Sequence, residues 1–285
     1  WFYNTSESLN PFSLAISSDG QFVAAGLGLY GEDSGRVCIF NRTNSSPLLD
    51  YSTNSTIFSI AISSDGRYVV AGAQDGKIYI FETNNTLPIW FYQTGHEVWS
   101  VAISSNGERV AVGSFDNNIY LFNSSSGVPL WIYDTEDNVY SVKISSDDQY
   151  IIAGSDSDDG KNLFLFNYNN PIPIWTYNIE YGVLNVDFSS NGEYIAVNGW
   201  YCVYLFKKGS DKPLWSINSD WTIYSLAISS NGQYVLAGSF SDAFLIPYNY
   251  VHSPRFDLGI ITIILNCIYG MIILSILHYI NKKKG

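Results

Sequence analysis

The chain has 285 residues and an acidic balance, with 14 Lys and Arg against 26 Asp and Glu and a formal net charge of −12. An acidic surface repels phosphate backbones, so nucleic acid is not an expected partner. Aromatic residues make up 16% of the chain and charged residues 14%, which indicates buried strands rather than a disordered polypeptide.

A stretch that encodes a β-hairpin occurs six times. In the copy at 59–72, an alternating apolar run leads into Ser-Ser-Asp-Gly, and a run rich in β-branched residues leads out. Asp-Gly between two such runs predicts a tight hairpin turn, because glycine adopts the positive φ that the turn requires. The copies lie at 13–26, 59–72, 100–113, 141–154, 185–198 and 225–238. A repeat of about 40–45 residues with four short strands is typical of a β-propeller blade.

The other two strands of each unit follow the hairpin. Third strands are predicted at 37–40, 78–81, 119–122, 163–166, 203–206 and 243–246. A fourth strand begins at a proline and usually carries a tryptophan, as in Pro88-Ile89-Trp90. The sixth unit lacks this strand, but residues 1–3 match the Trp-Phe-Tyr at 90–92 and are expected to supply it. The sequence therefore predicts an all-β, six-bladed propeller over 1–250, or seven blades if coding sequence precedes residue 1.

These motifs resemble those of the WD-repeat and quinoprotein-like propeller superfamily, and especially the tandem repeats of archaeal surface proteins. Two departures stand out. The third strands end in Phe-Asn or Phe-Glu rather than Trp-Asp, and only Gly95-His96 matches the Gly-His pair of the WD pattern. The buried Ser–His–Asp–Trp network of that family is therefore not expected. Aromatic packing between blades, chiefly by the fourth-strand tryptophans, is expected to hold the ring together.

Two positions near the propeller axis break the repeat. Four units carry alanine at one inward position of the first strand, whereas the fourth and fifth units carry Lys143 and Asp187. Opposite charges in adjacent blades predict a structural ion pair, because a lone buried charge is costly, with a ligand contact in the channel as the alternative. Cys38 and Cys202 fall at non-equivalent positions without metal-ligand spacing, so they are expected to be small buried hydrophobic residues.

The C-terminal segment has the composition of a membrane span. Residues 258–280 contain no Asp, Glu, Lys or Arg, and a helix of that length crosses a bilayer core. It follows a short linker at 251–257 and precedes a basic tail at 281–285. The three tail lysines predict a cytoplasmic C-terminus and an extracellular propeller. Glycosylation sequons agree with export and lie at Asn4, Asn41, Asn44, Asn54, Asn84 and Asn123. A tail-anchored cytosolic propeller is the alternative.

The face built by the second-to-third and fourth-to-first strand connections is predicted to point away from the membrane and to carry function. Its loops are acidic and hold aromatic residues, a combination that suits a cation, a basic protein patch or a sugar; a merely solvated surface is the alternative. The candidate ligand-binding residues are Trp221, Trp200, Tyr181, Asp134, Glu136, Asp137 and Asp220. Asp156, Asp158 and Asp159 only partly match a calcium loop, so no metal is predicted.

The sequence offers little for catalysis. It has no G-x-S-x-G elbow and no Gly-rich phosphate loop, and no cofactor is expected. The favoured interpretation is a membrane-anchored cell-surface propeller that binds an unidentified protein or glycan on its acidic face. The alternatives are a quinoprotein-like or sugar-cleaving enzyme and a structural component of the cell envelope.

Overall fold

The computed structural model describes residues 2–3, 9–157, 160–239 and 242–250, and the regular elements in these residues are all β strands. They are β1 (Asn10–Ile16), β2 (Phe22–Gly28), β3 (Gly35–Asn41), β4 (Leu49–Thr53), β5 (Ile57–Ile62), β6 (Tyr68–Ala73), β7 (Lys77–Glu82), β8 (Trp90–Gln93), β9 (Val98–Ile103), β10 (Arg109–Ser114), β11 (Asn118–Asn123), β12 (Pro129–Asp134), β13 (Val139–Ile144), β14 (Tyr150–Ser155), β15 (Leu163–Asn167), β16 (Trp175–Tyr177), β17 (Asn185–Phe188), β18 (Tyr194–Asn198), β19 (Cys202–Lys207), β20 (Pro213–Asn218), β21 (Ile223–Ile228), β22 (Tyr234–Ser239) and β23 (Ala243–Pro247).

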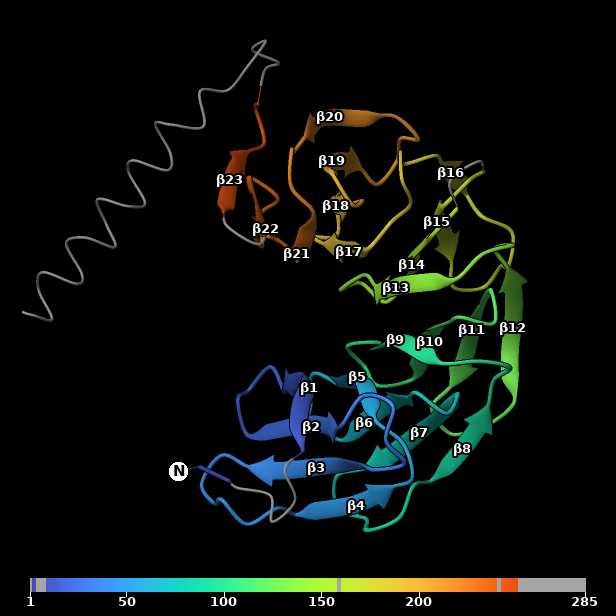
Figure 1. Cartoon of the computed structure of the whole chain (residues 1–285), viewed down its shortest axis with the longest axis vertical. Helices are drawn as coiled ribbons and strands as arrows, with labels where there is room; N and C mark the ends of the chain where they lie inside the picture. Colours follow the sequence, from blue (N-terminus) through green and yellow to red (C-terminus); the bar gives the residue numbers. More distant parts are fainter. Residues whose placement is uncertain (1, 4–8, 158–159, 240–241, 251–285) are drawn as a thin grey trace, which may run out of the picture.

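The strands form six antiparallel sheets of consecutive strands, which we number as blades 1 to 6. Blades 1 to 5 have four strands each, beginning at β1, β5, β9, β13 and β17, and blade 6 has the three strands β21–β23. The blades follow one another around a central axis, with the first strand of each innermost and the last at the periphery (Figure 1). The propeller prediction is confirmed. Residues 2 and 3, which were expected to extend blade 6, pair with no described strand.

The turn between the first two strands explains why Ser-Ser-Asp-Gly recurs. In blade 2, the Ser63 hydroxyl donates to an Asp65 carboxylate oxygen at 2.6 Å and accepts the Tyr68 backbone N–H at 3.0 Å. Gly66 has a φ of 71°, the left-handed conformation that glycine adopts without strain. Equivalent side-chain hydrogen bonds occur in the other blades, and in blade 4 the glycine position is Asp148, with a φ of 58°. The six predicted hairpins are confirmed.

The fourth-strand tryptophans join each blade to the next. Trp90 of blade 2 donates its indole N–H to the Ser124 carbonyl oxygen of blade 3 at 2.7 Å, and its ring lies 5.3 Å from that of Phe122. Trp131, Trp175 and Trp215 make the same kind of hydrogen bond to the following blade. The prediction that these side chains hold the blades together is therefore confirmed. Strands β12 and β20 begin at the predicted proline, whereas β8 and β16 begin at the tryptophan two residues later.

The hydrophobic core is divided among the boundaries between blades. At the boundary of blades 2 and 3, Val70, Ile78 and Ile80 of blade 2 pack with Val101 and Ile103 of blade 3. Similar clusters lie at the other boundaries from blade 1 to blade 6. Blades 2 to 5 thus bury apolar side chains on both of their faces, where the neighbouring blades cover them. Burial of apolar surface stabilises a protein by about 25 cal/mol per Å², so these boundaries contribute to the stability of the repeat array.

Cys38 and Cys202 are buried and free, as predicted. Burial raises the pKa of the Cys38 thiol to about 12, with a further contribution from the negative charge of Asp50. Both side chains therefore pack as small hydrophobic residues within blades 1 and 5.

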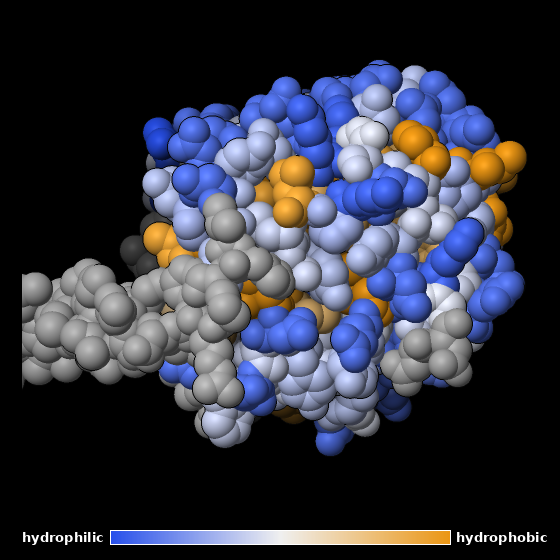
Figure 2. Space-filling model, turned by 90° about the horizontal axis from the view of Figure 1, so that it is seen from above, coloured by the Kyte–Doolittle hydropathy of each residue, from blue (hydrophilic) through white to orange (hydrophobic). Residues whose placement is uncertain are grey.

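The outer strands place alternate side chains in solvent. On β12, Leu130 and Ile132 are half exposed, while Trp131 between them faces the next blade. The surface seen from above in Figure 2 is mainly hydrophilic, with hydrophobic side chains in separate spots. No helix among the described residues is long and apolar enough to cross a membrane. The predicted span at 258–280, its linker and the basic tail lie outside the described residues.

Candidate functional site

An aromatic track crosses the mouth of the propeller on the face that carries the second-to-third and fourth-to-first strand connections, which we call the loop face. Phe12, Phe58, Trp99 and Tyr140 come from the first strands of blades 1 to 4. Successive ring centroids are 5.8, 4.8 and 6.0 Å apart. These four residues, which we call the aromatic rim, form a continuous surface of ring contacts around the axis.

Two loop residues extend the rim. Tyr30, in the loop between β2 and β3, stacks on Phe58 with a centroid separation of 5.7 Å. Phe115, in the equivalent loop of blade 3, stacks on Trp99 at 4.8 Å and meets Tyr140 edge-on at 4.9 Å. Offset stacks and edge contacts of this kind each stabilise the pair by about 0.5–1.5 kcal/mol beyond the buried area. The rim is therefore a rigid, pre-formed surface.

A β-bulge directs each rim residue toward the mouth. In blade 2 the pairing of β5 with β6 shifts between Ile57 and Ser59, so Phe58 has no partner across the ladder. The first strands of blades 1, 3, 4 and 6 shift at the equivalent place. A bulged residue leaves the alternation of the strand and changes the direction of its side chain. The sequence signal is an aromatic residue directly before the repeated serine, in five of the six copies, and sequence reasoning did not use it.

Acidic residues border the rim at blade 4. The Tyr140 hydroxyl donates to an Asp156 carboxylate oxygen at 3.4 Å. Burial, together with the negative charge of Asp156, raises the pKa of Tyr140 to about 12, so its hydroxyl is protonated at neutral pH. The Asp156 carboxylate also accepts a hydrogen bond from the Trp200 indole at 3.5 Å. Asp156 therefore connects the rim to the aromatic loops of blade 5.

Two of the predicted site residues lie on neighbouring connections that lead into and through blade 5. Trp200 lies in the β18–β19 loop and contacts Asp156 directly. Tyr181, in the β16–β17 connection, is half exposed and meets Tyr201 edge-on at 5.8 Å. These side chains form an aromatic extension of the loop face over blade 5.

The remaining predicted site residues are spread over neighbouring loops of the same face. Trp221 and Asp220 are exposed in the β20–β21 connection. Asp134, Glu136 and Asp137 lie in and beside the β12–β13 connection. Asp134 and Asp137 accept hydrogen bonds from nearby backbone N–H groups within that connection, so part of their role is to shape it. The seven residues share one face but do not converge on one pocket.

The Lys143–Asp187 ion pair is not among the ion pairs of the described residues. The Asp187 carboxylate instead accepts the backbone N–H of Phe188 at 3.1 Å and that of Ile228, in the next blade, at 3.2 Å. Burial raises the pKa of Asp187, and the positive charge of Lys143 and the two N–H groups oppose this without cancelling it. Asp187 thus links blades 5 and 6 through a backbone hydrogen bond.

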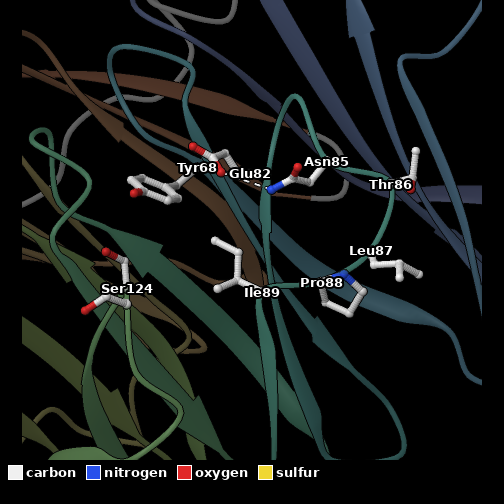
Figure 3. A pocket seen from close by; sticks show the side chains of 9 residues that line it. Tyr68, Glu82, Asn85, Thr86, Leu87, Pro88, Ile89 and Ser124 are labelled. Atoms are coloured by element: carbon white, nitrogen blue, oxygen red, sulfur yellow. Dashed lines mark hydrogen bonds between the residues drawn. The ribbon is translucent and has the colours of Figure 1, made fainter.

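A pocket of about 520 Å³ lies on the opposite face, at the outer margin of blades 2 and 3. Figure 3 shows it between the β7–β8 connection and Ser124, with Leu87, Pro88 and Ile89 along one side. Its carboxylate, Glu82, already accepts hydrogen bonds from Arg67 and Asn85. Both hydrogen bonds hold the Glu82 side chain in place at the edge of the pocket.

The other sequence predictions concern modification and metal binding. Asn44, Asn54 and Asn84 are exposed, and Asn41 and Asn123 are half buried at strand ends; Asn4 lies outside the described residues. Asn54 is on the loop face, whereas the other four described sequons lie on third-to-fourth strand connections of the opposite face. The described residues hold no cluster of three potential metal ligands, and Asp158 and Asp159 lie outside them.

Comparison with protein families agrees with the repeat architecture. The model of the WD domain, G-beta repeat, matches residues 45–82, 88–123, 127–161 and 211–244, which together make up half of the chain. The chain belongs to the WD40 repeat family. Each matched segment begins near the outer strand of one blade and extends into the third strand of the next, or just short of it, so the WD40 repeat is offset from the blade by one strand.

Solved structures show the same fold. A chain in the "Crystal Structure of Mitotic Checkpoint Complex" matches this WD40 propeller with a TM-score of 0.70 and 17% sequence identity. The match covers 86% of this chain and 80% of that chain, and at this identity it shows the fold alone. A search of the curated proteins found no match. The similarity to archaeal surface proteins stays a prediction.

The aspartates of the WD40 second-to-third strand loops are largely used within their own turns. Asp75 accepts the Lys77 backbone N–H and pairs with the Lys77 ammonium at 2.8 Å. Asp116 accepts hydrogen bonds from the backbone N–H groups of Gly95 and Asn118. These carboxylates set the loop geometry around the rim while leaving their negative charge on the loop face.

Proposed function

We propose that this WD40 propeller is an interaction module whose aromatic rim binds a partner segment that carries basic and apolar side chains. The continuous ring contacts of Phe12, Phe58, Trp99 and Tyr140 support the proposal most directly. Aromatic faces attract guanidinium and ammonium groups, and the carboxylates of the surrounding loops favour the same charge. Four of the five described sequons lie on the other face, so glycans there would leave the rim accessible.

Binding of a designed peptide tests this function. The probe is a nine-residue peptide of alternating arginine and leucine, and its charge-reversed control has glutamate in place of arginine. We expect the arginine peptide to bind, and Trp99→Leu to weaken its binding at least tenfold, because a cation–π contact and the central stack of the rim are lost. Titration calorimetry at low and moderate salt provides the measurement.

The matched control is Phe91→Leu, which removes an aromatic ring that is 61% exposed on the outer strand β8. It should leave the affinity unchanged. Equal affinity of the Trp99→Leu protein and the unmodified protein, or equal binding of the two peptides, would refute the assignment of the rim.

We further propose that residues 258–280 anchor the propeller in a membrane with the lysine tail in the cytoplasm. The uncharged length of this segment and the lysines after it support the anchor and its orientation. Such a topology would place the rim at the cell surface. Protease added to intact cells should digest the propeller and spare the tail. A propeller that resists digestion until the cells are lysed would indicate the opposite orientation.

A further inference from the structure

At four boundaries between blades, the indole N–H of a fourth-strand tryptophan marks the same backbone position in the following blade. The carbonyl oxygens that accept it belong to Ser124, Tyr168, Lys208 and Tyr248, at 2.7, 2.9, 2.9 and 3.2 Å. Each of these residues directly follows the third strand of its blade. We call this place in the repeat the boundary position.

At three of the four boundaries, the side chain at the boundary position packs on the residue that begins the second strand of the preceding blade. The pairs are Tyr168 with Arg109, Lys208 with Tyr150, and Tyr248 with Tyr194. In the first two pairs the cation lies 5.5 and 4.0 Å from the ring centroid. In the third pair two rings meet edge-on, with centroids 5.2 Å apart. A long side chain therefore fills each of these boundaries.

The boundary of blades 2 and 3 has a short side chain at this position, and a pocket lies beside it. Ser124 holds the boundary position, and Tyr68 begins the second strand of blade 2. Both residues line the pocket of about 520 Å³, together with Ile89 (Figure 3). A volume of this size is within the range of about 300–1,000 Å³ that is usual for ligand sites. The pocket thus lies where the chain supplies its own side chain at the other three boundaries.

The packing of Tyr68 matches that of Tyr194, whose partner at the boundary position is a tyrosine. A Cβ atom added to Gly107 would lie 2.9 Å from the Tyr68 ring, and one added to Gly232 would lie 2.1 Å from the Tyr194 ring. Both rings therefore lie directly against the turn glycine of the next blade. The side of the ring that Tyr248 contacts at Tyr194 corresponds to the pocket side at Tyr68.

The boundary of blades 4 and 5, which a lysine fills, is a poorer match. The three atoms nearest to a Cβ on Gly192 belong to residues other than Tyr150, so this ring does not lie against the turn glycine in the same way. A cation is also already present at Tyr68. The Arg67 guanidinium carbon lies 4.9 Å from the ring centroid, and its Nε donates to Glu82 at 3.0 Å. A second cation would be repelled there, whereas an uncharged ring would not.

We infer that this pocket binds the phenol ring of a tyrosine from a partner protein, edge-on to Tyr68. Edge contacts are a preferred arrangement of aromatic pairs. Leu87, Pro88 and Ile89 supply the apolar wall, and the other lining residues offer groups for hydrogen bonds to the hydroxyl. The site lies on the face opposite the aromatic rim, so the inference goes beyond the function proposed for the rim and does not depend on it.

Titration with p-cresol, the tyrosine side chain as a separate molecule, tests the site. The protein is produced without glycans, because the sequons at Asn84 and Asn123 adjoin pocket residues. We expect a saturable change in the methyl NMR shifts of Leu87. The competing probe, n-butylammonium, represents a lysine side chain and should bind more weakly. The absence of a saturable change with p-cresol, or equal or tighter binding of n-butylammonium, would overturn the inference.

Filling the pocket from within gives a second test. Ser124→Tyr places a tyrosine at the boundary position, as in blades 4 and 6, so p-cresol should bind at least tenfold more weakly and the midpoint of thermal unfolding should rise. The matched control is Asn169→Tyr, which adds an exposed tyrosine beside the filled boundary position of blade 4 and should leave the affinity unchanged. Equal affinity of the Ser124→Tyr protein and the unmodified protein for p-cresol would overturn the inference.

A smaller change keeps the test valid if Ser124→Tyr does not fold. Ile89→Ala removes part of the pocket wall at a side chain that is 42% exposed, and it should weaken p-cresol binding at least fivefold. Its control is Ile174→Ala, the equivalent change beside the boundary that Lys208 fills, which should have no effect. Circular dichroism confirms that both variants are folded. Unchanged binding by a folded Ile89→Ala protein would overturn the inference.

A peptide distinguishes a tyrosine of a partner protein from a free phenol. The peptide Gly-Ser-Tyr-Ser-Gly should displace p-cresol from the pocket, whereas Gly-Ser-Leu-Ser-Gly should not. Displacement by both peptides would show that the pocket does not select an aromatic ring. Binding of p-cresol without displacement by the tyrosine peptide would assign the pocket to free phenols. Either result would overturn the inference.

Discussion

At the residue scale, two carboxyl groups have pKa values shifted in opposite directions, so their ionisation affects stability in opposite ways. Asp19 sits in an exposed turn, where hydrogen bonds from the Ser17 hydroxyl and the Gln21 N–H lower the pKa of its carboxyl. Asp187 sits near the axis, where burial raises its pKa above the ordinary value. Compared with the unfolded chain, the folded protein therefore makes ionisation easier for Asp19 and harder for Asp187.

The raised pKa of Asp187 makes a prediction about pH. A carboxyl whose pKa is higher in the folded protein than in the unfolded chain stabilises the fold at low pH, and that contribution is lost as pH rises through the folded pKa. Asp187→Asn cannot ionise and keeps one oxygen, which can accept the Ile228 N–H; it gives up the hydrogen bond from the adjacent Phe188 N–H. The variant should therefore have a higher free energy of unfolding than the unmodified protein at pH 7, and this advantage should shrink on acidification through the folded pKa toward pH 4.

Urea unfolding at several pH values measures this difference. Asp19→Asn is the control, because its carboxyl has the opposite shift: the substitution should destabilise the protein at pH 7 and lose its effect in acid. If the gain in unfolding free energy from Asp187→Asn grew on acidification, the conclusion that the fold raises the pKa of Asp187 would be wrong.

At the scale of the element, the outer strand carries the main side-chain connection between blades. Trp131 of β12 combines a ring contact with Phe166 and an indole hydrogen bond of 2.9 Å to the Tyr168 carbonyl oxygen of blade 4. Trp131→Phe should cost about 1 kcal/mol, since it removes the hydrogen bond and keeps most of the ring. Trp131→Ala should cost about 3 kcal/mol, since it also removes the packing.

Denaturant unfolding of these two variants separates the two contributions. The neighbouring Leu130, which points to solvent, provides the control: Leu130→Ala should change stability by less than about 0.5 kcal/mol. Equal losses for Trp131→Phe and Trp131→Ala would show that the ring contact contributes nothing to the boundary.

Most of the fold could be predicted from the sequence because the local signals repeat. Ser-Ser-Asp-Gly forms its turn through contacts within a few residues, as Ser63 and Asp65 show, so the pattern itself encodes the structure. The aromatic rim was missed because it depends on the bulge at Phe58, which alternation of apolar residues does not reveal. The sequence also predicted Lys143 as the partner of Asp187, and it did not indicate that the carboxylate accepts a backbone N–H of the next blade. The repeated sequence pattern thus predicts where the strands lie, but it does not predict the hydrogen-bond partners of their polar side chains.

At the scale of the whole molecule, each blade contacts only its neighbours, as in other repeat proteins. The interior blades are stabilised on both faces, whereas blades 1 and 6 are stabilised by a neighbouring blade on one face each (Figure 1). Because of the offset between WD40 repeat and blade, each matched segment contributes strands to two adjacent blades. If one boundary is lost, all blades of such a ring stay connected through the others only when the boundary that closes the ring is also formed.

The repeated serine of the first strand gives this array a direction. In blades 1 to 4 this serine accepts a backbone N–H from the blade that follows in the chain. The side chain of each of these blades therefore depends on the next blade for its hydrogen bond. During synthesis, each completed blade therefore exposes a serine hydroxyl without its hydrogen-bond donor and an uncovered apolar face. Both are available to the next blade as it is synthesised. The polar acceptor thus lies at the advancing end of the growing propeller, whereas blade 1 at the other end exposes apolar side chains such as Leu14.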